Sequence, residues 1–117
     1  MKVKELYEKV NRYGLIFALN SAFGSNIKVN IPFSKTDLEA NIDDVGFSVR
    51  ANNALKRTGL MTVRAVTDAI VEDQLMRIRN LGKKSYNEIK TRLLQFGYNR
   101  LSDIEKISFL QDLIDNN

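Results

Sequence analysis

A chain of 117 residues can form one compact domain plus an appendage, and 44% hydrophobic with 27% charged residues is typical of a globular protein. It contains no cysteine and no histidine, which excludes disulfides, thiolate zinc sites and triads that need an imidazole or thiol. The net charge of +4 is unevenly spread, since residues 48–101 hold eleven basic and four acidic side chains. No apolar run is long enough for a membrane span or signal peptide, so we expect no membrane contact and a cytoplasmic location.

The first forty residues are predicted to form a helix and an extended segment. Apolar spacing predicts one helix over 3–22, ended by Gly24, with a buried stripe formed by Leu6, Val10, Tyr13, Phe17 and Leu19. Strict alternation over 27–33 predicts a short extended segment, which Pro32 restricts to a sheet edge or excludes from a sheet. Ser34 is expected to cap a brief helical turn over 37–40.

The rest of the chain is predicted to be all-α. Capping residues and apolar spacing predict helices over 49–58, 63–70 and 72–77, a long helix that ends at Gly97, and a last helix over 103–115. The expected inner faces are Ala51, Ala54, Leu55 and Thr58, then Tyr86, Ile89, Leu93 and Phe96, then Ile104, Ile107, Phe109, Leu110 and Leu113. The sequence leaves open whether the first and last helices pair within one molecule or between two.

A tight turn between two helices is the main functional motif. The run Leu75 to Ser85 places a short helix, an apolar-glycine turn and a basic helix start within a dozen residues, the layout of a helix-hairpin-helix. Unpaired N–H groups at a helix start suit a phosphate, Gly82 permits close approach, and Lys83, Lys84 and the Ser85 hydroxyl add charge and a donor. A plain helical hairpin with solvated lysines is the alternative interpretation.

A second basic element lies in the predicted helix 49–58. Arg50 and Asn53 are one turn apart on its outer face, opposite the small apolar residues. An arginine in this position can enter a narrow A·T-rich minor groove, where the potential is most negative, while the asparagine bonds to the groove edge. Taken alone, two such surface residues would more often be solvated.

Together these residues resemble the C-terminal domain of the bacterial RNA polymerase α subunit. The resemblance rests on Ile42-Asp43-Asp44, Ser48-Val49-Arg50, Asn53, Leu55-Lys56, Asn80 to Ser85 and Glu88-Ile89-Lys90, and it covers about 60 residues. It implies a compact bundle of four to five short helices with a helix-hairpin-helix, of the SAM and α C-terminal domain type, here over 41–101. The flanks are then an N-terminal helix and extended segment over 1–40 and an amphipathic helix over 102–117 that packs on the domain.

The resemblance also implies site residues and partners. The implied DNA contacts are Arg50, Asn53, Lys56, Gly82, Lys83, Lys84, Ser85 and, at the edge, Glu88. Asp44 is the implied protein contact, although Gly46 stands where the family tends to carry a further acid that faces sigma factor. Implied partners are A·T-rich double-stranded DNA, RNA polymerase, sigma factor and transcription regulators, with a location on the nucleoid. No cofactor is implied, and the oligomeric state is left open.

Other departures concern the edges of the match. The family's proline before the Asn-Leu-Gly is Arg79 here, and the family's glycine-rich, aromatic-containing tail is replaced by the helical pattern over 102–117. A complete α subunit carries a large assembly domain ahead of this one. Because only about forty residues precede the domain here, we expect a stand-alone relative, of the kind that a phage or mobile element encodes.

Two classes of function are therefore predicted, and a third is disfavoured. The first is a non-enzymatic module that binds A·T-rich duplex through the minor groove and phosphates. The second is an adaptor that engages transcription factors or polymerase, with DNA binding secondary. Catalysis is disfavoured because adjacent Asp43 and Asp44 would point apart on an extended segment, and no third carboxylate completes a metal site.

Overall fold

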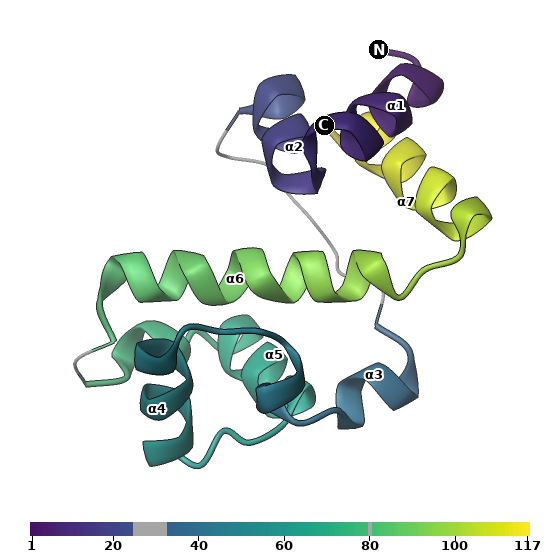
Figure 1. The fold of residues 1–117 in the computed structure, drawn as a ribbon. Helices are drawn as coiled ribbons and strands as arrows, with labels where there is room; N and C mark the ends of the chain where they lie inside the picture. The colour runs from purple at the N-terminus through teal and green to yellow at the C-terminus, as the bar shows by residue number, and fades with distance from the viewer. Residues whose placement is uncertain (25–32, 80) are drawn as a thin grey trace. The chain divides into compact units, whose positions relative to one another are not determined.

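The computed structural model describes residues 1–24, 33–79 and 81–117, and every regular element within these ranges is a helix (Figure 1). The prediction of an all-α fold is confirmed. One isolated antiparallel bridge joins Asn41 and Thr62. Apart from Phe33, the extended segment predicted over 27–33 lies outside the described residues. None of the described helices is long and apolar enough to cross a bilayer.

The protein divides into two compact units. One consists of Phe33–Phe96, and the other combines Met1–Pro32 with Gly97–Asn117. The first of these, which we call the central unit, is one continuous stretch of sequence. The other, which we call the terminal unit, is built from both ends of the sequence.

The central unit contains six helices in the described part of the sequence. They are α3 (Lys35–Glu39), the 3₁₀ helix η1 (Ile42–Asp44), α4 (Val49–Arg57), α5 (Val63–Val71), the 3₁₀ helix η2 (Leu75–Arg77) and most of α6 (Gly82–Asn99). Several begin at local capping signals, as predicted. The hydroxyls of Ser34, Ser48 and Thr62 each accept a hydrogen bond from the backbone N–H three residues later.

The core of the central unit brings together one apolar face from each main helix. Its fully buried side chains include Ile42, Leu55, Val63, Val66, Leu75, Ile89 and Leu93. Ala51 and Ala54 are also buried, as their spacing predicts. Thr58 is exposed rather than buried, because α4 ends at Arg57 and the Thr58 hydroxyl donates to the Ala54 carbonyl oxygen over 2.8 Å.

Two predicted helix boundaries in this region are wrong. The helix expected over 72–77 is only the 3₁₀ turn Leu75–Arg77, because Asp73 takes a positive φ of 56° and breaks the backbone direction after α5. The long helix does not end at Gly97 but continues to Asn99. Gly97 is buried, and the next residue, Tyr98, is only 4% exposed, so packing overrides the weak helix propensity of glycine.

The terminal unit contains α1 (Val3–Tyr13), α2 (Leu15–Phe23), α7 (Asp103–Asn116) and the end of α6. The single helix predicted over 3–22 is wrong, since the helix breaks at Gly14 with φ +93°, a conformation that favours glycine. The break turns Phe17 outward, and Tyr13 is exposed as well; their rings contact each other at 5.7 Å between centroids. Leu6, Val10 and Leu19 are buried as predicted.

Helix α7 packs against α1 within the same molecule. It begins at a capping box in which Ser102 and Glu105 exchange hydrogen bonds, and this bonding holds the pKa of the Glu105 carboxyl below its ordinary value. Phe109, Leu110 and Leu113 are buried as predicted. Ile104 is 83% exposed, however, and Ile107 is also exposed, so the apolar stripe expected along the whole helix is buried only in its second half.

Tyr98 is the buried polar group of the terminal unit. Its ring contacts Phe109 at 6.0 Å, and its hydroxyl is buried with no hydrogen-bond partner in the described part of the protein. Burial, together with the nearby Tyr7 and Asp103, raises the pKa of the Tyr98 hydroxyl to about 12.

Replacing Tyr98 with phenylalanine is expected to keep or increase stability at pH 7, because it removes a buried hydroxyl that lacks a partner among the described residues. The folded protein holds the Tyr98 proton up to about pH 12, whereas the unfolded protein releases it near the ordinary tyrosine value of 10.0, so wild-type stability falls as pH rises across that interval. The variant should lose less stability there. Urea midpoints at about pH 7, 9 and 11 measure this, and parallel profiles for the two proteins would contradict it.

Candidate nucleic-acid interface

The first turn of α4 presents two of the predicted DNA contacts. Ser48 caps the helix, so α4 begins at Val49 and Arg50 lies in its first turn. Arg50 and Asn53 are both exposed, whereas Ala51 and Ala54 are buried. The Arg50 guanidinium forms no ion pair with any described residue, so it is free to meet an external anion.

The start of α6 presents the second group. Gly82 has φ +75°, which lets the backbone turn from Leu81 into the helix, and an added Cβ would meet no neighbouring atom. The glycine is therefore required by backbone conformation rather than by space. Lys83 and Lys84 are exposed, whereas Ser85 is only 8% exposed. Ser85 is the least accessible of the eight predicted contacts, and its bond to phosphate stays a prediction.

Glu88 connects these two groups. The backbone N–H of Ser48 donates to the Glu88 carboxylate over 2.8 Å, a contact between residues forty positions apart. The N-cap of α4 is thereby tied to the second turn of α6. Glu88, predicted as an acidic residue at the edge of the DNA surface, therefore has a structural partner that sequence reasoning missed, because no local pattern links positions 48 and 88.

Lys56 is engaged within the protein. Its ammonium group lies 2.9 Å from Asp43 Oδ1, and the Asn52 amide donates to the same oxygen over 2.7 Å. These two bonds hold the pKa of the Asp43 carboxyl below its ordinary value. Because both members of the ion pair are partly exposed, Lys56 can exchange Asp43 for another anion at little cost.

The predicted protein contact, Asp44, lies on η1 and is exposed. Two residues later Gly46 takes φ +91°, so an acidic side chain there would be strained. This backbone conformation gives a physical reason for the glycine that departs from the family pattern. No group of three or more acidic, histidine or cysteine side chains is placed to hold a metal in the ranges that the structure describes.

Comparisons with known proteins assign the sequence that forms these helices to a family. A family model that describes the C-terminal domain of the alpha subunit of bacterial RNA polymerase matches residues 31–95, more than half of the sequence. The protein belongs to this family. No solved structure matches it.

A curated relative agrees with the assignment to the α C-terminal domain family. The DNA-directed RNA polymerase subunit alpha of Limosilactobacillus reuteri (strain DSM 20016) is 44% identical over 75 residues, which are 64% of this sequence. The aligned part is 21% of that protein, so the match spans about a fifth of the relative's length. The resemblance inferred from the motifs is confirmed, and with it a non-catalytic, DNA-binding module of the kind used in transcription.

Proposed function

We propose that the central unit binds A·T-rich duplex DNA across the minor groove. Arg50 enters the groove and Asn53 bonds to its edge, while the backbone of Gly82 and the ammonium groups of Lys83 and Lys84 bind phosphates. The Lys56 ammonium group also binds a phosphate, which replaces Asp43 as its partner. The Ser85 hydroxyl donates to a phosphate at the edge of this surface. In this proposal the protein acts on the nucleoid, beside RNA polymerase, sigma factor or transcription regulators, with Asp44 on the protein-facing side.

The hydrogen bond between Ser48 and Glu88 is the observation that supports this proposal most. Groove insertion requires Arg50 to be held at a fixed position relative to the phosphate-binding lysines, because a duplex presents groove and backbone at fixed spacing. One bond of 2.8 Å joins the cap residue two positions before Arg50 to the helix that begins at Gly82. The exposed basic groups therefore belong to two elements that are held together.

A duplex titration tests the proposal. The full-length protein is titrated into labelled A·T-rich and G·C-rich duplexes of equal length at two salt concentrations. We expect tighter binding to the A·T-rich duplex and a loss of about fiftyfold or more in affinity between about 50 and 200 mM salt, as for three or four phosphate contacts. Equal affinity for both duplexes would contradict groove recognition, and salt-independent binding would contradict the phosphate contacts.

Replacing Asp43 with asparagine is expected to strengthen binding to the duplex by about two- to fivefold, because the change frees Lys56 and removes one negative charge beside the DNA. Asp68→Asn is the matched control, since Asp68 is exposed on α5 and forms no bond with Lys56. Fluorescence anisotropy with the same duplex measures both variants. If the control gains as much as Asp43→Asn, the effect is one of net charge alone.

An adaptor role is the second candidate, favoured by large apolar side chains that the terminal unit exposes. Phe17 is 62% exposed beside Tyr13, and Ile104 is 83% exposed on α7. Contiguous exposed apolar surface, such as the contacting Tyr13 and Phe17 rings form, often marks protein contacts. Recovery of purified RNA polymerase by the immobilised protein, without measurable binding to either duplex, would favour the adaptor over the DNA-binding module.

A further inference from the structure

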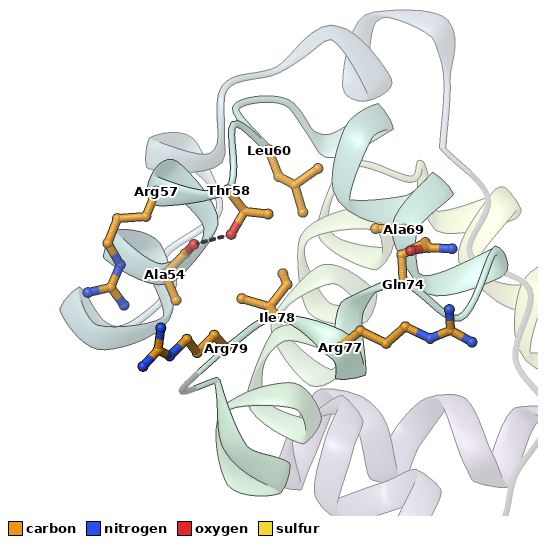
Figure 2. Close-up of a pocket in the computed structure, with 9 residues that line it drawn as sticks. All are labelled: Ala54, Arg57, Thr58, Leu60, Ala69, Gln74, Arg77, Ile78 and Arg79. Atoms are coloured by element: carbon orange, nitrogen blue, oxygen red, sulfur yellow. Dashed lines mark hydrogen bonds between the residues drawn. The ribbon is translucent and has the colours of Figure 1, made fainter.

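A pocket of about 610 Å³ opens in the central unit, between the end of α4, α5 and η2 (Figure 2). None of the residues that line it is among the eight proposed DNA contacts. We call it the arginine pocket, and it is lined by Ala54, Arg57, Thr58, Leu60, Ala69, Gln74, Arg77, Ile78 and Arg79.

The floor of the arginine pocket is apolar. Ala54 and Ala69 are buried, and Figure 2 shows the Leu60 and Ile78 side chains directed into the space between the elements. Thr58 adds little polarity, because its hydroxyl already donates to the Ala54 carbonyl oxygen. The floor can therefore take up an aliphatic side chain, which needs no hydrogen-bond partner.

The rim carries the charge. Arg57 and Arg79 extend to one side of the pocket and Arg77 to the other, and all three are exposed (Figure 2). The lining contains no acidic residue, and none of the three guanidinium groups has an ion-pair partner in the described ranges. Guanidinium groups bind planar carboxylates through two parallel hydrogen bonds, so the rim suits carboxylates on both sides of an apolar group.

We propose that the arginine pocket binds an acidic segment of a partner protein, with an aliphatic side chain on Leu60 and Ile78 and flanking carboxylates on the arginines. An apolar centre within a charged rim is the usual arrangement of a protein interface. A DNA backbone would satisfy the arginines but has no aliphatic side chain that could fill the floor. This inference does not depend on the DNA-binding function, because its residues are separate.

The test uses a probe of defined chemistry on the full-length protein. A fluorescein-labelled peptide of about ten residues, composed of glutamate and leucine, is compared with a peptide in which every leucine is serine. Anisotropy is measured at about 0.1 M salt with the wild type, the Arg57→Glu/Arg77→Glu double variant and Arg50→Ala. Thermal unfolding of each protein shows whether it is folded, and Arg57→Gln and Arg77→Gln serve as milder single variants.

We expect the glutamate-leucine peptide to bind the wild type and to lose about tenfold or more in affinity both on leucine-to-serine exchange and in the double variant. Arg50→Ala should bind the peptide within about twofold of the wild type, because Arg50 lies outside the pocket. Equal binding of the two peptides would overturn the role of the floor. Failure of the glutamate-leucine peptide to bind the wild type would overturn the proposal, and weaker duplex binding by the double variant in a parallel titration would then make the pocket part of the DNA surface.

Discussion

Replacing Arg50 with alanine is expected to weaken binding to an A·T-rich duplex by about 1 to 3 kcal/mol, a factor of about 5 to 150 in Kd. The side chain is exposed and forms no ion pair with a described residue, so we expect its loss to leave the fold of the central unit intact. Its contribution should therefore come from the groove, where the potential of an A·T-rich sequence is most negative. The preference for A·T-rich over G·C-rich duplex should shrink together with the affinity.

Arg64→Ala is the matched control for this measurement. Arg64 is also an exposed arginine of the central unit, on α5, and lies outside both the proposed DNA surface and the arginine pocket. The control removes the same charge from the same unit, so its effect should stay within about twofold. An equal loss of affinity in both variants would mean that the protein binds DNA through its overall charge and that Arg50 makes no specific contact in the groove.

Replacing Glu88 with alanine is expected to lower the free energy of unfolding by about 1 kcal/mol and the duplex affinity by about fivefold. Simple electrostatics predicts the opposite for affinity, because a negative charge is removed beside a polyanion. The expected loss follows from the bond between the Ser48 N–H and the Glu88 carboxylate, without which the first turn of α4 is no longer held beside α6.

Glu88→Gln separates the two effects. Glutamine keeps an oxygen that can accept from the Ser48 N–H but carries no charge. We expect duplex affinity at or above that of the wild type for Glu88→Gln and below it for Glu88→Ala, with thermal unfolding following the same order. Tighter binding by the alanine variant would show that Glu88 acts only as an acid at the edge of the surface.

The features predicted correctly from sequence are those that local chemistry determines. Ser48, Thr62 and Ser102 cap helices as expected, because a cap forms between a side chain and a backbone group three residues away. The break at Gly14 escapes prediction because apolar spacing continues on both sides of it. Gly97 is a misleading signal for a helix end, since the burial of the following Tyr98 keeps the helix intact.

Contacts between distant residues could not be predicted in the same way. The bond between Ser48 and Glu88 and the pair of Asp43 with Lys56 join different helices, and nothing in the spacing of these residues marks them as partners. In the sequence, Arg57 and Arg77 stand out only as part of a charge count, and Arg79 only as a departure from the family's proline. Folding gives them an apolar floor, which no linear pattern indicates.

The different connectivity of the two units has a consequence for folding during synthesis. The central unit is complete once residue 96 has been made and has left the ribosome, and its helices begin at caps that form from neighbouring residues. The terminal unit must wait, because α1 needs α7 from the opposite end of the sequence. The face of α1 that contacts α7 thus stays uncovered until α7 has been made, and aggregation of incomplete proteins is expected to start from α1 rather than from the DNA-binding module.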